Sequence, residues 1–275
     1  MKKLILLLIT LLIFTCGCTS SEKDREIIIA LLDTGISSTA IKGENILDGW
    51  NYVTNTADTE DRINHGTAVT SVIVGSDSAK VAGIAPTARI VPLVVTDKVE
   101  GKVTSISPET LAKAIRDSVD KYGASVINVS LGTKKDTPEL CEAIEYVQKK
   151  GALVIAAAGN DGDSKELYYP SAYDGVLTVG SHDKDMKISD FTQQNDTVDI
   201  LAPGEDIWLA SRNGKTYGAR GTSYATGFVS AAAVKIWEAT PTLTAEEVKN
   251  KILESAVTID GWKLLNTADN QEIIS

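Results

Sequence analysis

Short apolar runs alternate along the chain with stretches in which apolar positions recur every three or four residues. The apolar runs predict buried β-strands, and the longer period predicts helices that bury one face. The predicted strands are residues 27–32, 89–95, 125–129, 153–157 and 176–179, and the predicted helices are about 66–74, 108–122 and 138–150. Strands that alternate with helices form right-handed βαβ units. We therefore expect an α/β fold with a mostly parallel central sheet and helices on both faces.

The predicted helices carry residues that start and stop helices. Ser107 precedes Pro108 and Glu109, which is the order of a capping serine, a proline at the first helical position and an acid in the first turn. Gly123 and Gly151 lie where helix C-caps belong. Ligand sites in such sheets lie beyond the carboxyl ends of the strands, so functional residues are expected just after the predicted strands.

The N-terminal residues are predicted to be a targeting segment and not part of the fold. Lys2 and Lys3 precede an apolar run over residues 4–15, which is shorter than the roughly 20 residues that a membrane-spanning helix needs. Such a run fits the hydrophobic region of a secretory signal peptide. Gly17 before Cys18 resembles a bacterial lipobox, which implies lipid attachment at Cys18. Ordinary cleavage with release of a soluble product is the alternative.

These features divide the chain into three parts. Residues 1–17 are the predicted lipoprotein-type signal peptide, 18–25 a short tether, and 26–275 one domain. We expect an exported protein that is anchored to the cell membrane by its N-terminal lipid and faces away from the cytoplasm. Cys141 would then have no disulfide partner, and we expect it to be a small buried apolar residue.

Composition narrows the possible partners. Of the 275 residues, 43% are hydrophobic, which is enough for a full core. The formal net charge of −10 argues against nucleic acid as a partner, because the phosphate backbone calls for a basic surface.

Four polar residues stand at positions suited to catalysis. Asp33 ends a buried strand, and His65 opens an apolar helical run, whereas the other histidine, His182, lies in a polar stretch that we expect to be a loop. Ser223 precedes a long run of small residues, so a helix N-terminus would present it to a reacting carbonyl. A serine needs a base, and the base needs an orienting acid. Asn160 follows another strand and could donate a hydrogen bond to an oxyanion.

A competing interpretation comes from the segment Asp33-Thr34-Gly35, which also resembles the aspartic-peptidase motif. That chemistry needs two carboxylates that share one proton. The chain holds no second copy of the motif, so a dimer would have to supply it.

Taken together and in order, the motifs resemble those of the subtilisin-like serine peptidases. They are 29–36 around Asp33, His65-Gly66-Thr67, 157–160 ending in Asn160, and Gly221-Thr222-Ser223. The resemblance implies a three-layer α/β fold and peptide-bond hydrolysis by an acyl-enzyme mechanism. It implies that Ser223 is the nucleophile, His65 the base, Asp33 its orienting acid and Asn160 an oxyanion donor. No cofactor is expected for this chemistry.

The resemblance also implies how substrate binds. Ser130, Leu131 and Gly132 match the family segment whose backbone pairs with substrate, and residues 101–103 are a second such segment. We therefore expect an extended peptide or unfolded protein as substrate and a monomeric enzyme. Asp161 and Asp163 follow the oxyanion asparagine, which suggests a preference for a basic residue before the cut.

The chain departs from the family pattern in several places. Tyr224 replaces the usual methionine after the nucleophile, and Gly227 replaces a proline. Lys42 stands where a calcium-ligating aspartate is expected, so we predict no strong calcium site even though Asp77 could be a ligand. The segment between Cys18 and the first strand is shorter than a family propeptide, which leaves open how the enzyme folds and how it is held inactive. This short segment would also hold the active site close to the membrane, which favours a dedicated precursor-processing role.

Two other functions remain open. The first is a non-catalytic relative that binds peptides or regulates a protease, although all four residues of the expected site are present. The second is a structural surface lipoprotein, which would leave the ordered motifs unexplained.

Overall fold

The computed structural model describes residues 26–162 and 164–266. The predicted signal peptide, Cys18 and the tether lie outside the described residues, and so does Asp163. None of the helices in the described part is long and apolar enough to cross a membrane.

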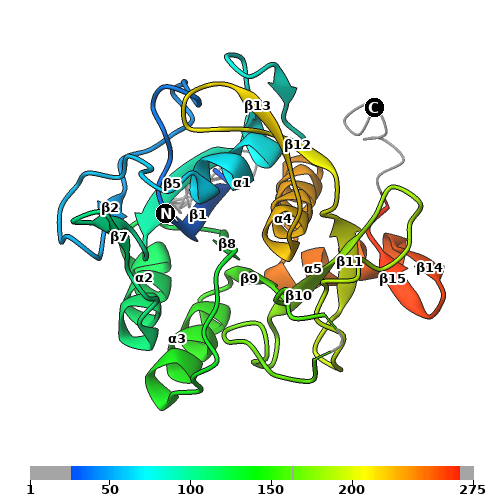
Figure 1. Cartoon of the computed structure of the whole chain (residues 1–275). Coiled ribbons are helices and arrows are strands. Elements are labelled where there is room, and N and C mark those ends of the chain that lie inside the picture. The colour runs from blue at the N-terminus through cyan, green and yellow to red at the C-terminus, as the bar shows by residue number, and fades with distance from the viewer. Residues whose placement is uncertain (1–25, 163, 267–275) are drawn as a thin grey trace, which may run out of the picture.

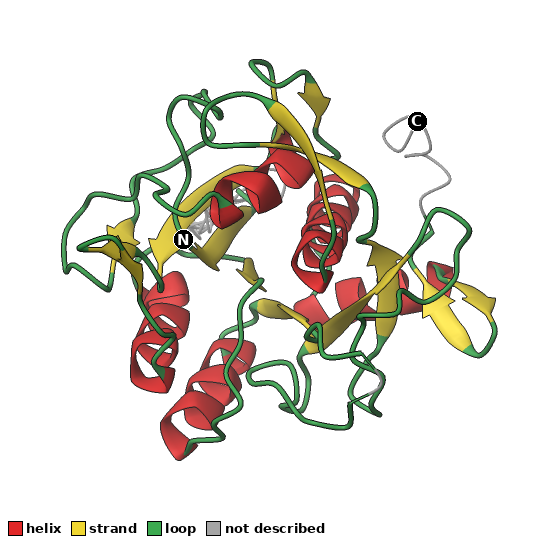
Figure 2. Ribbon diagram, in the orientation of Figure 1, coloured by secondary structure: helices red, strands yellow, loops and turns green. Residues whose placement is uncertain are grey.

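The described part of the chain contains five helices and fifteen strands (Figures 1 and 2). The helices are α1 (His65–Val74), α2 (Pro108–Asp120), α3 (Pro138–Lys149), α4 (Thr222–Ala239) and α5 (Ala245–Ser255). The strands are β1 (Ile28–Asp33), β2 (Trp50–Asn51), β3 (Gly75–Ser76), β4 (Val81–Ala82), β5 (Arg89–Val94), β6 (Lys98–Val99), β7 (Lys102–Val103), β8 (Val126–Val129), β9 (Leu153–Ala157), β10 (Leu177–His182), β11 (Ile200–Pro203), β12 (Ile207–Ala210), β13 (Thr216–Ala219), β14 (Val257–Ile259) and β15 (Trp262–Leu264).

One large sheet organises the domain. Its nine strands run in the order β14-β15-β11-β10-β9-β8-β1-β5-β2, and every neighbouring pair is parallel except β14 with β15 at one edge. Three short two-stranded sheets, including the hairpin β12–β13, lie outside it. The predicted α/β class with a mostly parallel sheet is confirmed.

Alternate residues of β1 supply two hydrophobic cores, because successive side chains of a strand point to opposite faces. Ile29 and Leu31 belong to the core that α1, α4 and α5 cover, whereas Ala30 and Leu32 belong to the core under α2 and α3. Figure 1 shows α2 and α3 together on one side of the sheet and α1 with α4 on the other. Burial on both faces explains why the central strands read as continuous apolar runs.

The predicted helix starts agree with the structure. The Ser107 side chain accepts a hydrogen bond from the Thr110 N–H at the start of α2, with Pro108 as the first helical residue. Gly123 and Gly151 have positive φ angles of 62° and 85° just after α2 and α3. Both glycines thus adopt the left-handed conformation that ends a helix.

Two predictions were wrong. His182 is not in a polar loop: β10 continues through Gly180 and Ser181 to His182, which is buried. Polar residues can occupy this strand because neighbours satisfy them, as when the Ser181 N–H donates to Thr192 Oγ1 over 2.9 Å. Cys141 is a free thiol but only half-buried, because it lies at the margin of the face that α3 packs against the sheet.

Candidate active site

The carboxylate of Asp33 lies at the carboxyl end of β1, between β5 and β8. It is fully buried, and its Oδ1 accepts hydrogen bonds from His65 Nδ1 and from the Thr34 N–H, both over 2.7 Å. These two donors satisfy Oδ1, whereas the buried Oδ2 has no hydrogen-bond partner among the described residues. Asp33 and His65 thus meet at the carboxyl end of a parallel strand, where a functional site is expected in such a sheet.

His65 begins α1, and two glycines allow the helix to approach β1. A methyl group on Gly66 would lie 2.2 Å from the Gly35 carbonyl oxygen, and one on Gly35 would lie 2.3 Å from the Thr59 carbonyl oxygen. Gly35 also has a φ of 103°. The Gly66 N–H donates to Thr34 Oγ1 over 2.8 Å, which fixes the helix start against the strand end. Gly35 and Gly66 therefore allow backbone segments to pack more closely than any side chain would permit.

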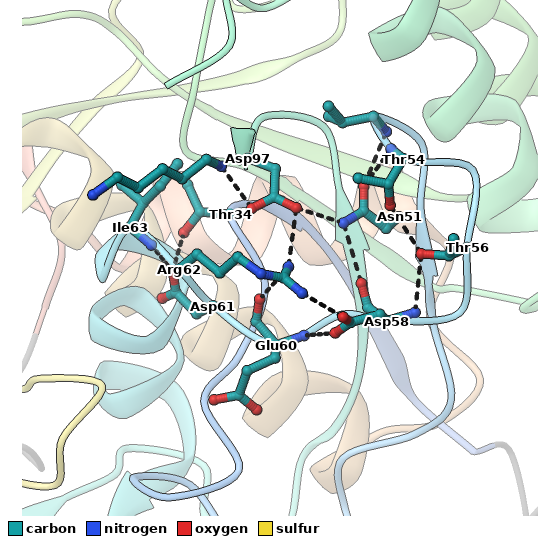
Figure 3. A network of polar contacts seen from close by, with 12 residues as sticks. Thr34, Asn51, Thr54, Thr56, Asp58, Glu60, Asp61, Arg62, Ile63 and Asp97 are labelled. Carbon is teal, nitrogen blue, oxygen red and sulfur yellow. Dashed lines mark hydrogen bonds and ion pairs between the residues drawn. The ribbon is translucent and has the colours of Figure 1, made fainter. Parts of the chain in front are cut away.

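Asp61 joins these two segments, and it was not among the residues predicted from the sequence. Its Oδ1 accepts from Thr34 Oγ1 (2.9 Å) and from the Ile63 N–H (2.8 Å), as Figure 3 shows. The Asn64 N–H also donates to this oxygen (2.7 Å). Its Oδ2 accepts from the Thr67 N–H (2.9 Å) and Oγ1 (2.6 Å). Asp61 is 1% exposed, and it satisfies amides at the start of α1 while it holds the loop before His65. An acid just before a predicted helix was the available signal.

A second polar network holds the same loop to the end of β5. Figure 3 shows Arg62 between Asp58 and Asp97, and Arg62 Nη1 lies 3.1 Å from the buried Asp97 Oδ2. Asn51 Nδ2 donates to the same oxygen over 2.7 Å and to the Asp58 carbonyl over 3.1 Å. The loop that leads into His65 is thus fixed at both of its ends.

Electrostatics favour the protonated form of His65. Burial alone would lower its pKa, but the charge of Asp33, the hydrogen bond to Asp33 and the charge of Asp61 together raise the pKa above its usual value. The His65 ring also lies 5.9 Å from the ring of Tyr224, the residue after Ser223. This contact places the start of α4 beside the imidazole.

Ser223 lies in the first turn of α4 and is 7% exposed. Its Oγ donates to the Ser130 carbonyl over 2.7 Å. The one proton of the Ser130 hydroxyl faces two acceptors, Asn128 Oδ1 at 2.8 Å and the Ser223 carbonyl at 3.1 Å. Among the described hydrogen bonds, none joins Ser223 to His65. The structure therefore places Ser130 of the expected substrate segment next to Ser223, and the half-buried Leu131 and Gly132 continue from it outside any strand.

Asn160 follows β9 and faces the start of α4. Its Oδ1 accepts from both the N–H and Oγ1 of Thr222 over 3.0 Å. With the oxygen engaged, the Nδ2 amide is left as the group that can donate to a ligand. A methyl group on Gly221 would lie 3.8 Å from this nitrogen, so Nδ2 lies at the start of α4.

The other sequence candidates have partners away from this centre. Nδ1 of His182 lies 2.8 Å from the Asp183 carbonyl oxygen, and burial lowers the pKa of His182. The Tyr168 hydroxyl donates to Asp161 Oδ2, and Lys134 Nζ lies 3.0 Å from the same oxygen. The hydrogen bond from Tyr168 and then the contact with Lys134 lower the pKa of Asp161. Neither residue contacts Asp33 or Ser223 in the described structure.

Comparison with known proteins fits this arrangement. Residues 24–272 match the model of the subtilase family. The chain belongs to the subtilase family. This subtilase is 36% identical over 246 residues to the major intracellular serine protease of Bacillus subtilis (strain 168), over 86% of this chain and 74% of that protein.

Solved structures agree with the family assignment. A cold-adapted subtilisin-like serine proteinase has a TM-score of 0.77 and 26% identity, over 87% of this chain and 88% of that one. The prenylagaramide maturation protease PagA has a TM-score of 0.74 and 31% identity, over 92% of this chain and 96% of that one. The predicted subtilisin-like fold is confirmed, and the chain is a serine endopeptidase of this family.

Proposed function

We propose that this subtilase is an exported, lipid-anchored endopeptidase that uses Asp33, His65 and Ser223 as a catalytic triad. The observation that carries the proposal is the 2.7 Å hydrogen bond between the buried Asp33 carboxylate and His65 Nδ1. The contact between the rings of His65 and Tyr224 supports it further, because Tyr224 follows Ser223 directly.

The hydrogen bond to Asp33 assigns the proton of the neutral His65 ring to Nδ1, which leaves Nε2 as the base. Ser223 now donates to the Ser130 carbonyl, and rotation about its Cα–Cβ bond turns the hydroxyl toward Nε2. Ser223 Oγ then attacks the scissile carbonyl carbon while its proton passes to His65. The Asp33 carboxylate stabilises the resulting imidazolium.

The remaining steps follow from the same groups. The oxyanion accepts hydrogen bonds from Asn160 Nδ2 and from the Ser223 N–H at the start of α4, where the helix dipole also favours negative charge. His65 then gives its proton to the leaving amine as the carbon–nitrogen bond breaks. Water hydrolyses the ester on Ser223 and regenerates the enzyme.

The substrate we propose is an extended peptide or an unfolded segment. Ser130, Leu131 and Gly132 run past Ser223, and a peptide strand could bond to their backbone. The amide of such a peptide would compete with Ser223 for the Ser130 carbonyl, which frees the serine hydroxyl when substrate binds.

The test is labelling of the full chain with a fluorophosphonate probe beside a Ser223→Ala variant. Labelling of the wild type alone is the expected result, because only an activated serine reacts with the probe. A folded wild-type protein that does not label would contradict the proposal and favour a non-catalytic, peptide-binding role.

We also propose that the chemistry needs no cofactor and that the enzyme acts as a monomer. Side chains supply the nucleophile, base and oxyanion donor. Lys42 lines the same cavity as Asp77, and its charge opposes a cation there. Labelling should therefore persist in excess EDTA, and light scattering should give the mass of one chain. A loss of labelling that calcium restores would contradict the first part.

The anchor is proposed from Gly17 and Cys18 after the apolar run. A Cys18→Ala variant should move the protein from the membrane fraction to the soluble exported fraction, whereas Cys141→Ala should not. Retention of Cys18→Ala in the membrane would refute lipid attachment at this residue.

We further propose that the enzyme processes precursors rather than degrading proteins broadly. A solved relative at 31% identity is described as a maturation protease, and an anchored enzyme meets newly exported chains. Comparison of protein N-termini between wild-type and Ser223→Ala cells should reveal only a few cut sites. Rapid digestion of unfolded casein to small peptides by the wild type would contradict this role.

A further inference from the structure

The aromatic ring of Tyr168 lies between two glycines of the candidate active site. A methyl group on Gly159 would lie 2.8 Å from Cδ2 and 3.1 Å from Cε2 of this ring, and one on Gly132 would lie 3.4 Å from Cδ1. The ring therefore occupies the space that separates the two backbone segments, and Gly159 has a φ of 112° where it passes the ring.

These two segments frame the position of the reacting carbonyl. Gly159 directly precedes Asn160, whose Nδ2 would hold the oxyanion, and Gly132 lies two residues after Ser130, whose carbonyl contacts the nucleophile. In a peptide aligned along residues 130–132, the Cα of the residue before the scissile bond is bonded directly to the reacting carbonyl carbon. In this alignment the side chain on that Cα would enter the slot between the segments, where Tyr168 lies.

Interactions at both ends hold Tyr168 in this slot. Its hydroxyl donates to Asp161 Oδ2 over 2.7 Å, and Lys134 Nζ lies 5.3 Å from the ring centre. The next residue, Tyr169, exchanges backbone hydrogen bonds of 2.8 and 3.0 Å with Thr133. The ring is therefore part of the wall of the site and not a freely moving side chain.

We propose that Tyr168 fills the pocket for the residue that precedes the scissile bond, so that the enzyme cuts after glycine, alanine or serine. The inference rests on the proposed function, because it concerns the substrate of the same site. It replaces the expectation of a basic residue at this position. The Asp161 carboxylate is already bound by Lys134 and Tyr168, and it is not free to select arginine or lysine.

The test compares kcat/KM for peptides that differ only at the residue before the cut, which is glycine, alanine, serine, leucine, phenylalanine or arginine. The wild type should prefer alanine to phenylalanine by about 100-fold or more, because a filled pocket excludes a large side chain. In Tyr168→Gly the ratio of phenylalanine to alanine should rise by about 100-fold. Tyr168→Phe keeps the ring and loses only the hydroxyl, so it should keep the preference for small residues.

Fluorophosphonate labelling of each variant separates the possible outcomes. If the wild type labels but cuts after phenylalanine or arginine as fast as after alanine, the pocket inference is overturned and the proposed function stands. The inference is equally wrong if Tyr168→Gly labels and keeps the wild-type ratio. If the folded wild type neither labels nor cuts any peptide, the proposed function fails and the inference fails with it.

Discussion

Replacement of Asp61 by asparagine should destabilise the protein and also change its catalytic pH dependence. Asparagine keeps the shape of the side chain but puts an NH2 group where one carboxylate oxygen was. At Oδ2 this group would face the N–H and the hydroxyl of Thr67, which now donate over 2.9 and 2.6 Å. The Thr67 hydroxyl can turn to accept from the NH2 group, but the Thr67 N–H cannot. A hydrogen bond to a charged group contributes about 1.5–3 kcal/mol, so this one lost bond lowers the free energy of unfolding by that amount. Domains of this kind have about 5–15 kcal/mol in total.

The effect on pH dependence comes from the charge of Asp61, which helps to raise the pKa of His65. His65 must be neutral to act as a base, so the acid limb of kcat/KM follows its pKa and should lie above pH 6.5 in the wild type. Removal of the Asp61 charge lowers that pKa, and the acid limb should move to lower pH.

Denaturant unfolding and a pH profile of kcat/KM measure the two effects in one variant. Asp185→Asn is the matched control, because Asp185 is exposed and its carboxylate is paired only with Lys184 in the described structure. The reasoning is refuted if Asp61→Asn loses less than about 1 kcal/mol and keeps the wild-type acid limb, since the lost bond from the Thr67 N–H should exceed that value.

Three further substitutions test separate parts of the structure. Asn160→Ala should lower kcat by about 10²–10³-fold with little change in KM, which is the loss that subtilisin shows when its own oxyanion asparagine is removed. An unchanged kcat would exclude Asn160 as an oxyanion donor. Gly66→Ala should lower the free energy of unfolding by at least about 3 kcal/mol, because its methyl group would lie 2.2 Å from a backbone oxygen. The control Gly218→Ala adds a methyl group in open space and should be tolerated. Equal melting temperatures of the two variants would contradict this. Thr244→Ala removes the capping box of α5 and should cost about 1 kcal/mol in denaturant unfolding, with no change in kcat/KM.

The sequence predicted the helices and strands in which apolar residues recur with one regular spacing or form one continuous run. β1, β8 and β9 are apolar because both faces of the sheet are covered, and the active-site candidates Asp33 and Asn160 followed from their positions after such strands. The hairpin β12–β13 and the edge pair β14–β15 were not predicted. β13, β14 and β15 are short strands with exposed residues, and β12 is an apolar run of only four residues.

Features built from contacts between distant residues were not predictable in this way. Asp61 is important because Thr34 and Thr67 both donate to it, and only the folded chain brings these threonines together. In the same way, Tyr168 is an ordinary loop tyrosine in the sequence, and its place between Gly132 and Gly159 depends on tertiary packing. Lipid attachment at Cys18 stays a prediction.

The order of the strands in the sheet has a consequence for the synthesis of the enzyme. β1 lies in the middle of the sheet, and its neighbour β8 comes almost a hundred residues later in the chain. The helix that carries Ser223 follows β11, β12 and β13, so it is made after every strand that has a parallel neighbour except β15. A partly synthesised chain therefore holds Asp33 and His65 without Ser223, the proposed nucleophile. By that proposal, a nascent molecule of this protease cannot attack itself or its neighbours until α4 has been made and has packed against the sheet.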